Sequence, residues 1–305
     1  MTLHEDELAI DDELVRRLVD TQMPQYAAYP LTAVRTTGSS NALFRLGDEL
    51  AVRIPRQPGG SATVLKEARW LPLVQPSLPV PTPYVVAVGE PDEGYPEHWS
   101  VVQWLPGHNP VVGEPHDQLA PHLARVVTAL RRLEVPGDAR SDPTLRWYRA
   151  EPLPGIDDDV RSALEACRSL PGLDLDLVSA AAVWDGTVAV ATSQESETEA
   201  HWLHGDLLAE NVLVRDGHLA AVLDFGGLAV GDPSVDLAVA WELLDSPGRT
   251  VFREAVGVDD RTWLSGRGWA LAIALLTFPY YWDTMPERCA SRLVMARRVL
   301  ADASR

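Results

Sequence analysis

The sequence has 305 residues, of which 46% are hydrophobic and 23% are charged, the usual composition of a globular protein. Its formal net charge of −18 at pH 7 argues against a nucleic-acid partner, because an acidic surface repels phosphates. Residues 1–7 are acidic without a signal-peptide core, and no apolar run reaches membrane-spanning length, so we expect a cytoplasmic protein without membrane contact.

The first third of the chain has the pattern of a small sheet with helices. Apolar residues at helical spacing predict a helix over residues 11–19, which Asp11 or Asp12 could cap. A second helix is expected over residues 61–74, after Pro58-Gly-Gly60. Strand-like segments occupy residues 31–35, 42–46, 49–54, 84–88 and 99–105. We therefore predict five antiparallel strands packed with one main helix.

The pattern becomes helical after Leu105, which predicts a boundary there between two lobes. Residues 1–105 would form the smaller lobe and residues 106–305 a larger, mostly helical one, giving an α+β fold. Loops are expected at residues 136–155 and 192–200. Helices are expected at residues 118–133, 157–169, 175–191, 235–244, 248–255, 260–279 and 286–301.

The most informative stretch runs from His204 to Asp224. Asp206 and Asn211 are five residues apart, and a hairpin turning at Asp216-Gly217 would return the chain so that Asp224 lies beside them. One carboxylate could then accept a hydroxyl proton while an amide oxygen and a second carboxylate hold Mg²⁺. Phosphoryl transfer from ATP needs this arrangement, because its catalysis depends on positioning and charge neutralisation.

These motifs resemble the catalytic segment of the aminoglycoside phosphotransferase family. His204-Gly-Asp206 with Asn211 matches its HGDxxxxN motif, and Asp224-Phe-Gly226 matches its DFG-like triplet. Gly231-Asp-Pro233 follows, as in the family, and the resemblance covers about residues 31–300. It implies a protein-kinase-like fold with two lobes and assigns Asp206 to the acceptor hydroxyl, with Asn211 and Asp224 as Mg²⁺ ligands. The chain lacks an Ala-Pro-Glu motif after Asp224, which argues against a protein substrate.

The resemblance also implies the residues that hold the nucleotide. Arg53 stands where the phosphate-binding residue of the third strand is expected, and Glu67 would pair with it. Arg53 replaces the lysine that is commoner in kinases. Ser39 and Ser40, in a predicted hairpin tip over residues 37–41 with one glycine, would cover the phosphates. Residues 103–107 would form the hinge, where adenine bonds the backbone of Gln103 and Leu105.

Asp236 and His204 are expected to support the catalytic loop rather than to react. By resemblance, Asp236 braces the backbone of residues 204–206, and Asp232 before Pro233 caps the helix that follows. His204 is expected to be a structural hydrogen-bonding residue, because Asp206 is better placed for the hydroxyl.

The acceptor region carries weaker signals. Glu242 and Asp245 could pair with ammonium groups of a substrate, and Trp241 and Tyr281 could stack on its flat groups. The negative net charge would attract a polycation, although acidic surfaces also serve solubility alone. Taken singly, such acidic residues are more often solvated helix residues, and most large aromatic residues belong to the core.

The expected activity is ATP- and Mg²⁺-dependent phosphorylation of a small-molecule hydroxyl by a monomer or homodimer, with GTP left open as donor. An antibiotic such as an aminoglycoside or a macrolide is the expected acceptor. A metabolic kinase of the choline, homoserine or fructosamine type is the alternative. A nucleotide-binding pseudokinase scaffold is disfavoured, since Asp206, Asn211 and Asp224 are all present. Cys167 and Cys289 could pair but are expected to be buried free thiols.

Overall fold

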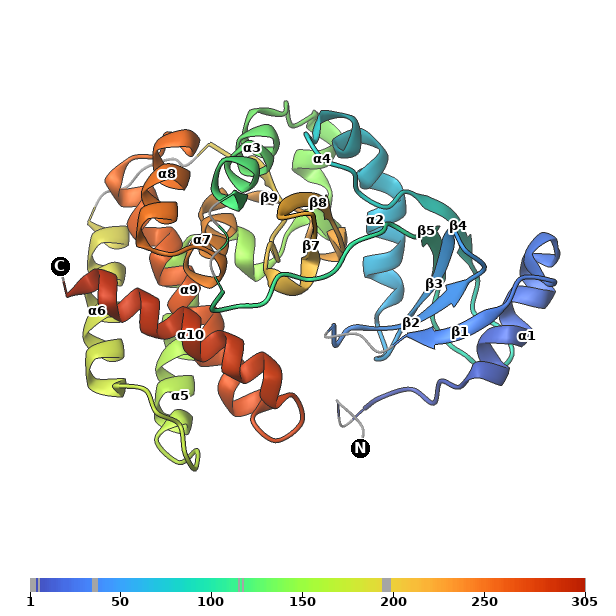
Figure 1. Cartoon of the computed structure of the whole chain (residues 1–305), viewed down its shortest axis with the longest axis horizontal. Helices are drawn as coiled ribbons and strands as arrows, with labels where there is room; N and C mark the ends of the chain where they lie inside the picture. The colour runs from blue at the N-terminus through green and yellow to red at the C-terminus, as the bar shows by residue number, and fades with distance from the viewer. Residues whose placement is uncertain are drawn as a thin grey trace.

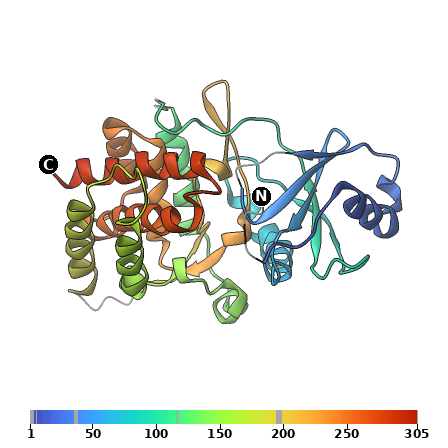
Figure 2. The ribbon, with the colours of Figure 1, turned by 90° about the horizontal axis from the view of Figure 1, so that it is seen from below.

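A five-stranded antiparallel sheet lies at one end of the molecule and a group of helices at the other (Figure 1). This computed structural model describes residues 4, 6–34, 38–114, 116, 118–193 and 199–304. Seen after a 90° turn, the sheet and the helices remain at opposite ends (Figure 2). Two hydrophobic cores correspond to these parts. One is formed by side chains of the sheet and of residues 14–23, and the other by the helical part together with Trp70, Leu71 and Val74. The predicted boundary at Leu105 stays a prediction.

The sheet confirms the five predicted strands. Its order is β1-β2-β3-β5-β4. The bounds are β1 (Leu31–Val34), β2 (Asn41–Leu46), β3 (Leu50–Pro55), β4 (Val85–Gly89) and β5 (Trp99–Gln103). Alternate residues of β2 are buried, namely Ala42, Phe44 and Leu46, as a half-buried strand requires. Arg35 and Thr37, which the prediction placed in a strand and in the hairpin tip, lie outside the described residues.

Two helices pack with the sheet. Helix α1 (Asp12–Gln22) is capped by Asp11, whose carboxylate accepts a hydrogen bond of 2.7 Å from the backbone N–H of Leu14. Helix α2 (Ser61–Val74) has the predicted bounds and stands between the sheet and the rest of the molecule (Figure 1). Its first turn is held by Glu97, which accepts hydrogen bonds from the backbone N–H groups of Gly59 and Ser61. Helix α2 therefore presents side chains to both halves.

The second half is built around α9 (Asp260–Tyr281), in which most residues from Gly266 to Phe278 are buried. It packs against α5, α6 and α10. The predicted helices are confirmed with small shifts in their ends. They are α3 (Leu119–Arg132), α5 (Asp157–Cys167), α6 (Leu177–Thr192), α7 (Val239–Leu243), α8 (Ser246–Val256), α9 and α10 (Pro286–Ala303). Cys167 and Cys289 are buried and free, as predicted.

Two predictions of local structure are corrected. Residues 136–155 are not simply a loop, because they contain α4 (Gly137–Ser141) and three short 3₁₀ turns between Pro143 and Ile156. Pro143 begins the first of these turns, Pro154 is the second residue of the last, and Asp142 caps Thr144; these features favour tight turns over a longer helix. The helix expected from residue 235 begins as a 3₁₀ helix (Pro233–Ala238), and α7 starts only at Val239.

The catalytic segment folds as two short antiparallel pairs. Strands β7 (Val212–Arg215) and β8 (His218–Val222) form the predicted hairpin, whose turn residues Asp216 and Gly217 have φ angles of 54° and 76°. These left-handed conformations suit Asp-Gly. Strand β6 (His201–Leu203) pairs with β9 (Ala229–Gly231), a pairing that the sequence did not predict because both strands are three residues long. Among the described helices, none combines the length and apolar character that a bilayer crossing requires.

Candidate active site

The loop between β6 and β7 carries Asp206 and is held by Asp236. The carboxylate of Asp236 accepts hydrogen bonds from the backbone N–H groups of His204 at 2.7 Å and Gly205 at 2.8 Å. Gly205 has a φ of 79°, and a Cβ there would lie 2.4 Å from the carbonyl oxygen of Gly227. A glycine is therefore required at this position for both conformation and space.

His204 links this loop to the strand that precedes Asp224. Its ring is fully buried, its Nε2 lies 2.9 Å from the carbonyl oxygen of Leu223, and its Nδ1 accepts from the Asp206 N–H at 3.2 Å. The ring also packs on Phe225 with a centroid distance of 4.5 Å. With both nitrogens used and no solvent access, His204 supports the loop.

Asp206 lies between Asn211 and Arg149. The Asn211 amide donates to the backbone oxygen of Asp206 at 2.8 Å and to its Oδ2 at 3.0 Å. Arg149 donates to Oδ1 of Asp206 and to the carbonyl of Gly205. Burial alone would raise the pKa of Asp206, but Arg149, with His204 and Arg292 nearby, holds that pKa below its usual range. Asp206 is therefore ionised at neutral pH.

Arg53 joins β3, α2 and the DFG-like triplet. It donates through Nη1 to both oxygens of Glu67, at 2.9 and 2.7 Å, and through Nη2 to Oδ1 of Asp224 at 2.7 Å. Burial works against the charged guanidinium, but Asp224 and Glu67 raise the pKa of Arg53 above its ordinary value. The charged guanidinium of Arg53 is therefore fixed in position beside Asp224.

The oxygen atoms at this point suit a hard divalent cation. The side-chain nitrogen of Asn211 is hydrogen-bonded to Asp206, which leaves the side-chain oxygen of Asn211 to bind a cation. Asp224 can offer a cation its Oδ2, because Arg53 bonds only Oδ1. Within the described residues no group of three or more His, Cys, Asp or Glu side chains could enclose a metal alone. These ligands therefore fit Mg²⁺, which is usually held by one or two carboxylates together with phosphate oxygens and water.

Two cavities meet at Asp206 and Asp224. One, which we call the hinge cavity, has a volume of about 680 Å³ and is lined by Arg53, Asn211, Gln103 and Leu105. The other, which we call the arginine-rich cavity, has a volume of about 470 Å³. Its cationic side chains are Lys66, Arg146, Arg149, Arg288 and Arg292. Ser39, Ser40, Asn41, Glu210 and Arg288 line both cavities together with the two aspartates. A group bound in one cavity would thus face a group bound in the other.

The tip before β2 reaches across to the C-terminal helices. Ser39 is buried, and its hydroxyl bonds the Tyr281 hydroxyl at 2.9 Å and Arg288 at 3.1 Å. His4 contacts the carbonyl oxygen of Ser39 at 3.1 Å. Ser39 and Ser40 therefore line both cavities where these meet, and their role in covering phosphates stays a prediction.

The expectation for the acceptor-binding residues is corrected at three positions. Trp241 and Glu242 are fully buried in α7, where Trp241 donates to Asp302 and Glu242 accepts from the backbone N–H of Ala209. Asp245 caps α8 by accepting from Gly248. None of the three lines either cavity. Glu242, the charged residue of α7, bonds the backbone of Ala209 after the catalytic Asp206, so its charge supports that loop instead. Tyr281 does line the arginine-rich cavity.

Sequence reasoning missed most cations of the arginine-rich cavity. Arg149 comes from the segment expected to be a loop, and Arg288 and Arg292 from the last helix. Arg292 is buried and bonds both Glu242 and Glu210. Only a neighbouring Trp147-Tyr148 pair, on which Arg149 stacks, hinted at a functional segment. The separations along the chain are too long for any local pattern to reveal these contacts.

The fold and this site define a phosphotransferase of protein-kinase-like architecture. The model of the phosphotransferase enzyme family matches residues 32–270, and the chain belongs to that family. The predicted family and fold class are thereby confirmed. No curated protein matches the sequence.

Solved structures of antibiotic phosphotransferases share the fold over almost the whole chain. The GDP complex of aminoglycoside 2'-phosphotransferase-IIIa is 17% identical with a TM-score of 0.68, covering 96% of this chain and 100% of that one. A macrolide 2'-phosphotransferase from Brachybacterium faecium is 20% identical with a TM-score of 0.58, covering 95% and 98%. Macrolide 2'-phosphotransferase type I is 17% identical with a TM-score of 0.62, covering 94% and 97%. At these identities the likeness concerns the fold.

Proposed function

We propose that the protein transfers the terminal phosphoryl group of a Mg²⁺-bound nucleoside triphosphate to a hydroxyl group of a small molecule. The observation that carries the proposal is the meeting of the two cavities at Asp206 and Asp224. A triphosphate in the hinge cavity would present its last phosphate to an acceptor in the arginine-rich cavity. That is the geometry of an in-line displacement.

The hinge cavity supplies the donor side of the reaction. Arg53, held by Glu67, would bind the α- and β-phosphates, and the backbone of Gln103 and Leu105 would bond the base. Mg²⁺, held by Asn211 and Asp224, would neutralise the phosphate oxygens during transfer. Neighbouring structures contain GDP or ADP, which supports a nucleotide here. We take ATP as the donor, with GTP as the second candidate.

Asp206 supplies the acceptor side. Its ionised carboxylate would accept the hydroxyl proton as the oxygen–phosphorus bond forms, while the bond from the terminal phosphorus to the bridging oxygen breaks. Arg149 and Asn211 hold that carboxylate in place. Ser39 and Ser40 lie over the junction, where they would exclude water from the transferred group.

The structural neighbours act on antibiotics, which supports an antibiotic alcohol as the acceptor and a role in resistance. A metabolic alcohol is a second candidate, because the cavity that would hold the acceptor is lined by five cations. Both candidates share the same chemistry at Asp206.

Mass spectrometry of ATP-dependent transfer across antibiotics and small alcohols tests the proposal, with Asp206→Asn as the inactive variant. We expect a product heavier by one phosphoryl group, and loss of roughly three orders of magnitude in kcat for Asp206→Asn. Affinity for Mg²⁺·ADP should stay within about twofold, since Asp206 serves the acceptor. Asp216→Asn, in the exposed hairpin turn, is the matched control. Full turnover by Asp206→Asn would refute the proposal.

A further inference from the structure

We infer that Lys66 and Arg146 form an anion-binding subsite in the arginine-rich cavity, and that the acceptor is an alcohol carrying a carboxylate or phosphate group. This inference rests on the proposed function, because it names the class of substrate for the same site. It departs from the expectation that the acidic chain attracts a polycation.

No carboxylate on the wall of this cavity is left for a substrate ammonium group among the described residues. Asp206 pairs with Arg149, and Asp224 pairs with Arg53. Glu210 is shared by Arg292 at 2.6 Å and Arg288 at 3.4 Å. A polycation that entered the cavity would therefore find each of its carboxylates already paired with an arginine.

Lys66 is the one lysine in the sequence, against 25 arginines. Its side chain is 9% exposed, and it lines the arginine-rich cavity but not the hinge cavity. Within the described part of the chain it has no hydrogen bond or ion pair. The adjacent Glu67 is not its partner, because both carboxylate oxygens of Glu67 accept from Nη1 of Arg53. A buried ammonium without a partner is costly, so a ligand anion is the partner that this position lacks.

The other nearby acid is also engaged. Asp142 accepts hydrogen bonds from Trp70 at 3.0 Å and from Thr144, and it pairs with Arg69 at 3.1 Å. It therefore already has three partners of its own. Lys66 remains the cation of α2 that faces the cavity.

Arg146 supplies the second positive charge. It is exposed, lines the same cavity, and has no side-chain hydrogen bond or ion pair within the residues described. A guanidinium binds carboxylate or phosphate through two parallel hydrogen bonds, and an ammonium adds a compact point charge. Thr63 also lines the cavity and can donate a hydroxyl hydrogen bond. Together these groups match a carboxylate or phosphate.

The whole chain is negative and this cavity is positive, and the two charges act on a ligand over different distances. The net charge of −18 acts through salt-screened solvent, whereas the cations of the cavity lie within contact range of a ligand. Short-range contacts therefore decide which acceptor binds. An aminoglycoside would place ammonium groups against Lys66 and Arg146, which is repulsive.

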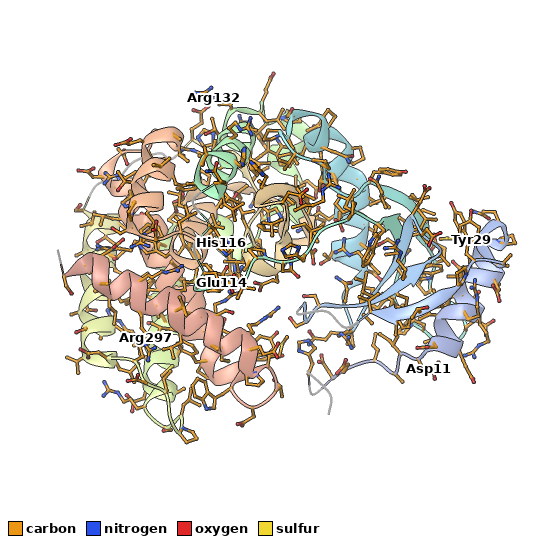
Figure 3. All side chains as sticks on the ribbon, viewed as in Figure 1. Asp11, Tyr29, Glu114, His116, Arg132 and Arg297 are labelled. Carbon is orange, nitrogen blue, oxygen red and sulfur yellow. The ribbon has the colours of Figure 1, made fainter. Side chains whose placement is uncertain are left out.

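The first test uses the single lysine as a probe. Protein containing ¹³C-labelled lysine gives one set of lysine NMR signals, and Mg²⁺ with a non-hydrolysable ATP analogue fills the donor side. We expect inorganic phosphate and glycerol 3-phosphate to shift the Lys66 signal saturably, and glycerol to leave it unchanged. Arg146→Gln should raise the dissociation constant of phosphate by about tenfold. Arg132→Gln, at the exposed outer edge of the helices (Figure 3), is the matched control. No saturable shift, or equal affinity in Arg146→Gln, would overturn the subsite.

The second test measures phosphate transfer to matched alcohols with and without an anionic group, and to kanamycin. Wild-type protein should prefer the anionic alcohols, and Lys66→Gln should raise their KM by on the order of tenfold to a hundredfold while kcat changes little. If the protein phosphorylated kanamycin more efficiently than every anionic alcohol, the inferred acceptor class would be refuted and the proposed function would stand. Lysine shifts without any transfer would support the subsite and refute the proposed function.

Discussion

Arg149 bonds the carboxylate of Asp206 and the carbonyl of Gly205 with one guanidinium, and so holds both the side chain and the backbone of the catalytic loop. The guanidinium stacks on Trp147 at 4.9 Å, which limits its own freedom. Arg149 thus fixes the orientation of the group proposed to accept the proton. This contact also explains why Asp206 stays ionised in a half-buried position.

Replacing Arg149 by Gln should lower kcat by about tenfold to a hundredfold, because Asp206 loses its orientation and its ion pair. Affinity for Mg²⁺·ADP should be unchanged, since Arg149 does not line the hinge cavity. Arg149→Lys should recover part of kcat. Steady-state kinetics and calorimetry measure both effects, and an unaltered kcat in Arg149→Gln would rule out the positioning role.

Replacing Asp224 by Ala should weaken nucleotide binding in a Mg²⁺-dependent way. With Mg²⁺ present, we expect the dissociation constant of ADP to rise by about tenfold or more, because one oxygen ligand is lost. Without Mg²⁺ the change should be smaller, since Arg53 keeps its contacts with Glu67. Calorimetry with and without Mg²⁺ separates the two cases. Equal losses in both conditions would contradict the metal role.

Replacing Glu242 by Gln should destabilise the protein. Glu242 is fully buried, pairs with Arg292 and accepts the backbone N–H of Ala209. Removing its charge leaves Arg292 partly uncompensated, at a cost of about 3 kcal/mol in the free energy of unfolding. Glu254→Gln, exposed on α8, should change it by less than about 0.5 kcal/mol. Urea unfolding measures both, and similar values for the two variants would contradict the buried pair.

Lys66 should titrate near neutrality. Burial lowers the pKa of its ammonium group from 10.5 to about 8, and the single ¹³C-lysine signal reports that value directly. The unfolded chain keeps the proton up to the ordinary value, so it binds more protons than the folded chain between the two pKa values. The free energy of unfolding should therefore rise with pH across this window, by up to about 3 kcal/mol relative to Lys66→Met. A lysine pKa near 10.5 would contradict this burial.

Local patterns determined much of the fold. Helix α2 and the five strands follow from spacing and turn residues, because burial on one face of a helix or strand leaves a periodic trace. The Asp216-Gly217 turn predicted the hairpin for the same local reason. Arg53 and Glu67, only 14 residues apart on successive elements, could be paired by resemblance and lie in contact.

By itself, then, the sequence determined the elements, the family and the group of Asp206, Asn211 and Asp224, all of which depend on near neighbours in the chain. Only the tertiary structure decided the charge of the acceptor side. Arg149 reaches Asp206 across 57 residues and Arg292 reaches Glu242 across 50, so these partners are set by packing. That packing buries Glu242 and Trp241, which the sequence placed at the acceptor, and leaves Lys66 facing the cavity. An ionisable side chain carries no local mark of its partner, because Coulomb contacts depend on distance in space and on burial.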